Sequence, residues 1–342
     1  MTAAVVTGVA SALPATFDQD AIWDGYFARH YEGVGAARRI FASAGVRRRH
    51  AVANPMDADI SGWGTGARMV RYVQEALPLG KQAVAGALDA AGLAPGDVGL
   101  FAVATCTGYA TPGLDIRLAG DLGMPVGLQR LLVGHMGCYA AIPGLAAVSD
   151  FVTARSRPAV LLCCELTSLH VQPAQRDLEQ VVAHALFSDA AAAVVLEPGA
   201  ARGRRLAGVV ARTDASTADH MTWDVTDLGF RMGLSPRVPD VLSRHVGGVV
   251  DELLGGAGLR MEDVAGWAVH PGGPRILDVV RDQLGLTEEQ IATSRRVLAE
   301  HGNCSSATVL LVLEEMADVD GPVVVMAFGP GLTLYAALLL PA

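Results

Sequence analysis

The chain has 342 residues, of which 51% are hydrophobic and 18% are charged, which is enough for a large core in one domain or two fused halves. Its formal net charge of −9 argues against nucleic acid as a partner, because phosphate backbones bind basic surfaces. Five cysteines without paired spacing predict reduced thiols in a cytoplasmic protein, and the absence of CxxC and HExxH motifs gives no indication of a metal site.

The first half of the sequence predicts alternating strands and helices. Residues 18–45 are typical of helices, and a long amphipathic helix is expected over 66–92, interrupted by Pro78 and Gly80. A polar loop is expected at 107–115. Buried strands are expected at 4–13, 98–106, 131–134, 158–164 and the end of 183–198.

A stretch rich in Pro and Gly, 198–203, predicts a boundary between two similar halves, 1–200 and 201–342. In the second half we expect an irregular segment at 219–236, with strands and helices alternating around it. The uncharged stretch 321–342 is broken by Phe328-Gly329-Pro330-Gly331, which favours two buried strands over a membrane helix. This alternation predicts a layered α/β fold, and no membrane segment is expected.

Cys138 lies in the stretch LLVGHMGCYAAIPG, residues 131–144, where a buried strand is expected to meet a buried helix through a Gly-flanked turn. A helix N-terminus carries partial positive charge and free N–H groups, so it favours a thiolate. Cys138 is therefore a candidate nucleophile, and the alternative is a small buried hydrophobic residue.

Two polar clusters in the second half can complete thiol chemistry. His270 ends an apolar strand before Pro-Gly-Gly, and Asn303 lies in a small-residue loop that opens a helix. A nucleophilic thiol needs a group to share its proton and donors for an oxyanion, which these side chains can supply. A structural histidine and a helix cap are the alternatives. A papain-like protease has the same order of residues, but its cysteine lies near the mature N-terminus in a different signature.

Five motifs in this order resemble the type III polyketide synthases, the branch of the thiolase-fold condensing enzymes that is similar to chalcone synthase. They are GHMGCYAA around Cys138, LFSDAAAAVVL at 186–196, HPGGPRIL from His270, GNCSSA from Gly302 and FGPGLT from Phe328. The resemblance implies a five-layered αβαβα thiolase-like fold and a homodimer. It implies malonyl-CoA and an acyl-CoA starter as substrates, with a carrier protein as a further candidate donor, and no cofactor beyond coenzyme A thioesters.

The resemblance also implies roles for the catalytic residues. Cys138 would carry the acyl starter as a thioester and form an ion pair with His270. His270 and Asn303 would stabilise the enolate that malonyl decarboxylation leaves. Further site residues are implied at the gate, along the cavity and at the CoA phosphates: Phe187 and Phe230 as gatekeepers; Cys106, Thr111, Met221, Trp223, Gly272 and Ser305 along the cavity and tunnel; and Arg47, Arg48 and Arg49 for CoA. The Thr111-Pro112 bond is expected to be cis, with Thr111 entering the partner's cavity.

The implied function is repeated decarboxylative Claisen condensation followed by cyclisation to a small aromatic or pyrone. A single-condensation 3-ketoacyl synthase or acyltransferase of the same superfamily is the alternative enzyme. A noncatalytic acyl-binding protein with the thiolase fold is the alternative outside enzymes. Resorcinol, pyrone, phloroglucinol and naphthalene products all agree with the sequence.

Overall fold

The computed structural model describes residues 2–342, and its strands form one large sheet and two small ones. The strands are β1 (Ala4–Ala12), β2 (Thr16–Asp18), β3 (Arg48–His50), β4 (Leu100–Thr105), β5 (Gln129–Gly134), β6 (Ala159–Leu166), β7 (Asp189–Pro198), β8 (Arg204–Thr213), β9 (Met221–Thr226), β10 (Gly229–Leu234), β11 (Gly266–Val269), β12 (Val323–Gly329) and β13 (Thr333–Pro341).

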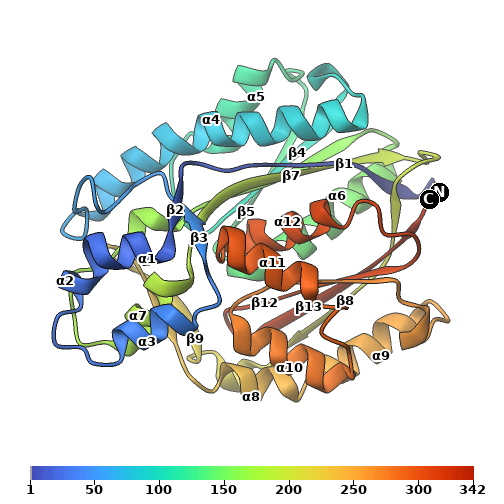
Figure 1. Ribbon diagram of the computed structural model, residues 1–342. Coiled ribbons are helices and arrows are strands. Elements are labelled where there is room, and N and C mark those ends of the chain that lie inside the picture. The colour runs from blue at the N-terminus through green and yellow to red at the C-terminus, as the bar shows by residue number, and fades with distance from the viewer. Residues whose placement is uncertain (1) are drawn as a thin grey trace.

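The helices occupy the outer faces and the centre of the molecule (Figure 1). They are α1 (Gln19–Ile22), α2 (Ala28–His30), α3 (Ala37–Ser43), α4 (Thr65–Ala91), α5 (Leu114–Leu122), α6 (Ala141–Arg155), α7 (Leu178–Leu186), α8 (Val238–Ser243), α9 (Val246–Gly256), α10 (Pro274–Leu284), α11 (Ala292–His301) and α12 (Thr308–Glu315).

The large sheet is built from two parts with the same strand order. One part runs β1-β7-β6-β4-β5 and the other runs β8-β13-β12-β11. In both parts the first two pairings are antiparallel and the next is parallel. The parts join only where β1 meets β8, at Val5 opposite Arg205 and Val6 opposite Arg204. Within residues 2–342, the second part has no counterpart of β5.

Alternating residues of the strands build a five-layered αβαβα arrangement. In β12, Val323, Val325 and Ala327 pack in the cluster that contains α6 and α12. The intervening residues, Val324 and Met326, pack in the cluster that contains α9 and α10. The same period of two places the other part of the sheet between α4 and the central helices. The result is the thiolase-like fold, with α6 and α12 in its middle layer (Figure 1).

Three expectations for local structure are wrong. Helix α4 is continuous through Pro78 and Gly80. Gly80 allows a close approach to α5, since a Cβ there would lie 3.0 Å from Leu118. Residues 219–236 form the β9–β10 hairpin instead of irregular structure. Strand β5 is a sheet edge rather than a buried strand, and Leu132 on it is 48% exposed.

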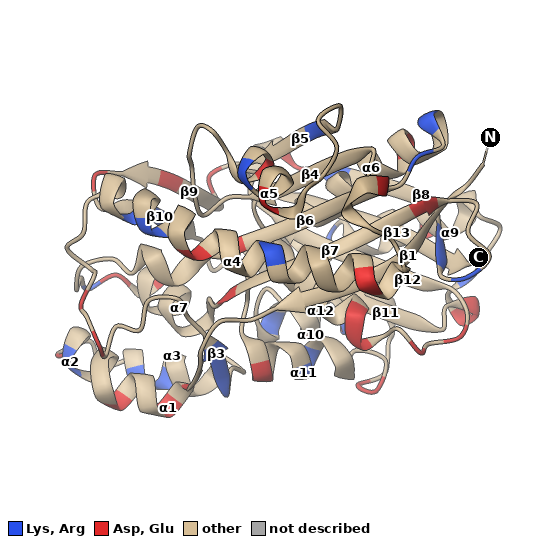
Figure 2. Cartoon of the chain, turned by 90° about the horizontal axis from the view of Figure 1, so that it is seen from above, with Lys and Arg blue, Asp and Glu red and all other residues tan. Residues whose placement is uncertain are grey.

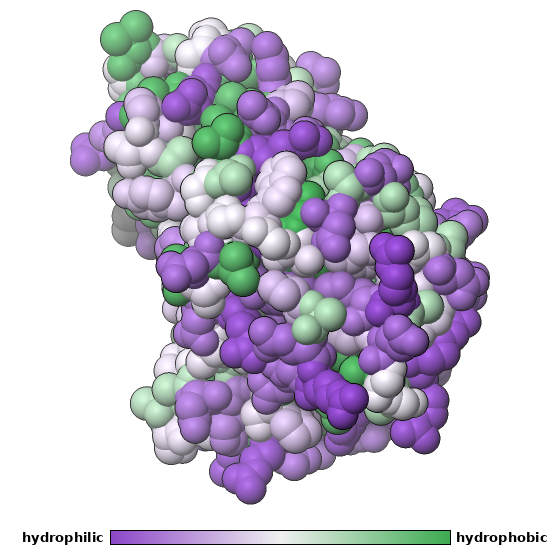
Figure 3. Space-filling view, turned by 90° about the vertical axis from the view of Figure 1, so that its left-hand side faces the viewer, coloured by the Kyte–Doolittle hydropathy of each residue, from purple (hydrophilic) through white to green (hydrophobic). Residues whose placement is uncertain are grey.

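Charged residues of both signs alternate over the outer helices and loops, and no basic stripe runs along residues 2–342 (Figure 2). The side that carries α1 to α3 is mostly hydrophilic with scattered apolar patches (Figure 3). One helical stretch, residues 137–155, is long and apolar enough to cross a membrane. However, 61% of that stretch is buried within the protein, as in the core helix of a globular fold.

Candidate active site

Cys138 lies in the short 3₁₀ turn η3 (Gly137–Tyr139), between β5 and α6. Gly137 has a φ of +77°, and a Cβ there would lie 2.6 Å from the Pro330 ring, so glycine is required. A Cβ on Gly329 would lie 3.3 Å from the Cys138 nitrogen. The Phe-Gly-Pro-Gly turn at the end of β12 therefore packs against the backbone of Cys138, and this residue is only 6% exposed.

A second 3₁₀ turn, η7 (Ser305–Ala307), opens α12 against the first one. The Ser305 hydroxyl lies 3.3 Å from the Cys106 thiol. Burial raises the pKa of Cys138 to about 12, and hydrogen bonding from Ser305 and Asn303 limits this rise. The structure therefore brings Cys138, Cys106, Ser305 and Asn303 together at the starts of the two central helices.

His270 follows β11 and faces the same site from the second half. Its backbone N–H donates to Met326 O at 2.8 Å, and the residue is only 1% exposed. Both ring nitrogens are buried without a hydrogen-bond partner among residues 2–342. A Cβ on Gly272 would lie 3.7 Å from Nε2, so this glycine leaves open space beside the ring.

The Asn303 carboxamide has a fixed orientation. Its Oδ1 accepts from the backbone N–H of Ser305 at 2.9 Å, which directs Nδ2 away from the start of α12. Nδ2 then donates to Gly272 O over a long 3.4 Å. The donor therefore points toward the space that Gly272 leaves beside His270, where an oxyanion could accept from both side chains.

The expected resting ion pair between Cys138 and His270 is not favoured by this environment. Burial lowers the pKa of His270 to about 3 and raises that of Cys138, because both charged forms lose hydration. Burial therefore opposes the charge that the expected ion pair would place on each group. A neutral imidazole can act as a general base when the thiol attacks.

Glu165 is a buried residue that the sequence interpretation missed. It ends β6 and is completely buried, and burial raises its pKa. It accepts from Cys106 N at 3.0 Å, Thr107 Oγ1 at 2.7 Å and Ser306 Oγ at 2.6 Å. Glu165 thus ties the loop that carries Cys106 to the turn that carries Ser305. The sequence signal that could have identified Glu165 is a carboxylate near the end of an otherwise apolar strand.

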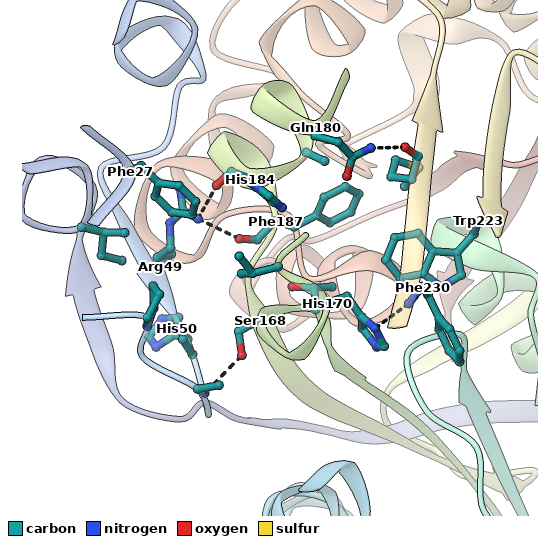
Figure 4. A pocket seen from close by; sticks show the side chains of 18 residues that line it. Phe27, Arg49, His50, Ser168, His170, Gln180, His184, Phe187, Trp223 and Phe230 are labelled. Carbon is teal, nitrogen blue, oxygen red and sulfur yellow. Dashed lines mark hydrogen bonds between the residues drawn. The ribbon is translucent and has the colours of Figure 1, made fainter. Parts of the chain in front are cut away.

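Both expected gatekeepers border a cavity of about 50 Å³ (Figure 4). Phe187 ends α7 and pairs with Asn303, whose N–H donates to Leu186 O at 2.8 Å. Phe230 lies on β10 and is 2% exposed. Trp223 on β9 also borders the cavity, and its indole N–H donates to Cys106 O at 2.6 Å.

Only one of the six expected cavity and tunnel residues, Trp223, borders this cavity. The five that do not are Cys106, Thr111, Met221, Gly272 and Ser305. Met221 packs against Val238, Val241 and Leu332 and does not border this cavity, because it lies at the far end of the hairpin. Thr111 is exposed, and the Thr111-Pro112 bond is cis as expected.

The structure contradicts the role expected of Arg49 in binding CoA. All five guanidinium N–H donors are used within the protein, because the side chain is buried beneath α7: they meet Gln19 Oε1 and the carbonyls of His184, Ala185 and Phe187. Arg47 and Arg48 are exposed, and both form ion pairs with Glu300.

Arg39, on the exposed face of α3, was not identified from the sequence. It borders a shallow depression with Ala36 and Ser43, and it forms no ion pair within residues 2–342. The end of α3 abuts the turn that carries Gly272, since a Cβ on Gly45 would lie 3.7 Å from Pro274. Arg39 is thus an exposed cation without an ion-pair partner among residues 2–342.

Two family models cover most of the chain. The chalcone and stilbene synthase N-terminal domain matches residues 59–200, and the C-terminal domain of the same family matches residues 210–341.

Named relatives and solved structures agree with these models. The chain is 40% identical to a 1,3,6,8-tetrahydroxynaphthalene synthase of Streptomyces peucetius subsp. caesius, over 88% of this chain and 82% of that protein. It is 31% identical to the alpha-pyrone synthesis polyketide synthase-like Pks18 of Mycobacterium tuberculosis, over 88% and 81%. The structure of PKS-I from the brown alga Ectocarpus siliculosus matches with a TM-score of 0.94 at 27% identity, over 100% and 99%. The chain therefore belongs to the chalcone and stilbene synthase family and is a type III polyketide synthase, an acyltransferase-type enzyme that condenses malonyl-CoA.

Proposed function

We propose that this polyketide synthase carries its growing chain on Cys138 and uses His270 and Asn303 for decarboxylative condensation. This proposal rests on one observation. Asn303 Nδ2 and the His270 ring, which has no hydrogen-bond partner within residues 2–342, both border the space beside Gly272. Coenzyme A thioesters are the only substrates that the chemistry requires. The five free, buried cysteines support a reducing, cytoplasmic compartment.

Loading begins when the Cys138 sulfur attacks the thioester carbonyl of the starter. The thiol proton passes to His270, a bond forms between sulfur and the acyl carbon, and the bond to the CoA sulfur breaks. The leaving thiolate then takes the proton from His270. The burial of both groups supports this order of events, because it disfavours a charge that persists on either of them between turnovers.

Extension requires a carbanion at the malonyl carbon. The bond to the carboxylate breaks, carbon dioxide leaves, and its electron pair forms an enolate on the thioester oxygen. Neutral His270 and the Asn303 amide donate hydrogen bonds to that oxygen. The carbanion attacks the acyl carbon on Cys138, and the bond between that carbon and the sulfur breaks. The Cys138 thiolate that leaves takes up one proton from solvent before the lengthened chain is loaded again.

We propose a short starter and a naphthalene-type product assembled from malonyl units. Trp223, whose indole N–H donates to Cys106 O at 2.6 Å, places a bulky side chain beside the loop that carries Cys106, which supports a short starter. The relative at 40% identity, named for tetrahydroxynaphthalene, supports the product class. A pyrone is the second candidate product, because the relative at 31% identity is named for alpha-pyrone synthesis.

A homodimer through β5 is also proposed. Consecutive residues of this edge strand, including Leu131 and Leu132, are exposed in the single chain, and Val126 before it is fully exposed. An uncovered apolar sheet edge is a surface that a second copy can cover. Sedimentation should give twice the chain mass, and Leu132→Lys should shift the protein toward monomer while Leu178→Lys does not. A monomeric wild-type protein would contradict the dimer.

Incubation with malonyl-CoA alone, followed by product and intact-protein mass spectrometry, tests the function. We expect a product built only from malonyl units and an acyl adduct that Cys138→Ala lacks. Cys106→Ala is the matched control, since it removes a neighbouring thiol and keeps the nucleophile. A product with a single condensation would support the ketoacyl synthase alternative. An adduct that persists in Cys138→Ala would reject the nucleophile.

A further inference from the structure

The free edge of β10 is bound by side chains instead of another strand. Four backbone groups, at every second residue along this edge, are satisfied in this way. Phe230 N–H donates to His170 Nδ1 at 3.0 Å, Phe230 O accepts from Gln172 Nε2 at 3.1 Å, Met232 O accepts from Gln180 Nε2 at 2.5 Å, and Leu234 N–H donates to Glu179 Oε2 at 3.1 Å. Figure 4 shows the bonds of His170 and Gln180 beside Phe187. Both backbone groups of the gatekeeper Phe230 are therefore held by residues 170 and 172.

The His170 imidazole contacts Phe230 in two ways, through a hydrogen bond to its backbone and through stacking on its ring. Nδ1 accepts from Phe230 N–H, so Nε2 carries the proton and donates to Thr107 O at 2.7 Å. The imidazole and phenyl rings stack with centroids 4.6 Å apart and planes 9° apart. Burial lowers the pKa of His170 to about 4, so the ring stays neutral and keeps its acceptor at physiological pH.

The segment that carries His170 is itself fixed from beneath. Arg68 is completely buried and donates to the carbonyls on both sides of His170, those of Leu169 and Val171. A Cβ on Gly229 would lie 3.0 Å from His170 Nδ1, and Gly229 has a φ of +92°. The hairpin therefore approaches His170 closely at Gly229, and the ring borders the small cavity on another side.

We propose that His170 and Gln172 are positioning residues for the gatekeeper Phe230, and that they keep water from the malonyl carbanion. This inference rests on the proposed function of the site. When Phe230 is displaced, the carbanion takes a proton from water instead of attacking the acyl thioester. Malonyl-CoA then gives acetyl-CoA and carbon dioxide, and the hydroxide left by water is consumed as bicarbonate. The positioning residues thus set the share of decarboxylation that lengthens the chain.

The experiment compares His170→Ala with His170→Asn, whose Oδ1 can occupy the acceptor position of Nδ1. The readout is the ratio of acetyl-CoA released to malonyl units found in product. A lost hydrogen bond of about 1 kcal/mol corresponds to about a fivefold rise of this ratio in His170→Ala, and His170→Asn should return most of the way to wild type. Gln172→Leu should raise the ratio similarly, and it provides a second variant if His170→Ala does not fold.

Val225→Thr is the matched control, because Val225 lies opposite Phe230 on β9 and is 66% exposed. Its ratio should equal that of wild type. Equal ratios in His170→Ala, His170→Asn and wild type, with folded proteins by thermal melting, would overturn the positioning role.

A second readout separates this inference from the proposed function. Alkylation of Cys138 by iodoacetamide, followed by intact mass, needs no condensation. We expect His170→Ala to react about fivefold faster than wild type and His170→Asn to react at nearly the wild-type rate, on the same one-bond basis. If wild type makes no condensed product, this rate still decides whether His170 holds the gate. An unchanged rate in His170→Ala would reject it.

Discussion

The two halves of the molecule place the start of a central helix at the same site and use it differently. In the first half, Gly137 is left-handed and is followed by Cys138, a cysteine that forms no disulfide within residues 2–342. In the second half, Ser305 is left-handed and is followed by Ser306, whose hydroxyl donates to Glu165 at 2.6 Å. One helix start presents a nucleophile, and the other is tied to a buried carboxylate.

This difference shows how a repeated scaffold can separate two tasks. Both helix N-termini direct partial positive charge to one site, which favours the thiolate and the enolate that form during reaction. The first half supplies the atom that becomes acylated. The second half supplies neutral donors, His270 and Asn303, that hold developing charge. Changes in the second half should therefore affect decarboxylation more than thiol loading.

The largest effect is expected from Asn303→Ala. This change removes a preorganised donor from the enolate, so malonyl decarboxylation should slow by about 100- to 1000-fold. Formation of the Cys138 thioester should change far less, because Asn303 does not take its proton. Carbon dioxide release and intact mass measure the two steps separately. Thr308→Val is a control, since its hydroxyl meets Asn303 Oδ1 only at 3.4 Å. Equal losses in decarboxylation and in thioester formation would contradict the separation of these two tasks between the halves.

The positions of the reacting groups were predictable from sequence for a physical reason. Cys138, His270 and Asn303 each lie in a turn with Gly or small residues after an apolar element, and such turns need special backbone geometry that leaves a local signature. The alternation of apolar strands and helices likewise predicted the layered fold. These features depend on neighbouring residues in the chain.

Features that depend on distant partners were not predictable in this way. The β9–β10 hairpin lacks a clear alternation of polar and apolar residues, and its free edge is bound by side chains about 60 positions earlier in the sequence. Arg49 resembles a surface cation in the run Arg47-Arg48-Arg49, yet it is buried because α7 presents carbonyl groups to it. The exposure of β5 depends on which strand lies at the sheet edge.

A smaller effect is expected on the pH dependence of stability, where one buried histidine from each half can be compared. Burial lowers the pKa values of His184 in the first half and His270 in the second to about 3. At a pH between this value and 6.5, the unfolded chain binds a proton at each position and the folded chain does not. The free energy of unfolding therefore falls as pH decreases, by about 1.4 kcal/mol per pH unit for each histidine.

His184→Gln and His270→Gln should each lower the slope of the unfolding free energy against pH by the contribution of one proton. Urea unfolding between about pH 4 and 6 measures this slope. Asp189, whose pKa burial raises to about 6, acts in the opposite direction, but it cancels when variants are compared with wild type. His220→Gln is a control, because His220 is a histidine near the surface of the second half. A wild-type slope in His270→Gln would mean that this imidazole is already charged in the folded enzyme.

The smallest effect is expected from Arg39, an exposed cation of the first half. Arg39 is exposed and lies on α3, whose end abuts the turn that carries Gly272. If its guanidinium binds a CoA phosphate, Arg39→Ala should raise the KM for malonyl-CoA about tenfold and leave kcat nearly unchanged, because a charged hydrogen bond contributes about 1.5–3 kcal/mol. Arg47→Ala is the matched control, since Arg47 already pairs with Glu300. A larger KM change in Arg47→Ala than in Arg39→Ala would indicate that Arg47, and not Arg39, binds the CoA phosphate. A loss of kcat in Arg39→Ala would indicate that Arg39 acts in the chemical step. The first half would then supply a charged group as well as the nucleophile.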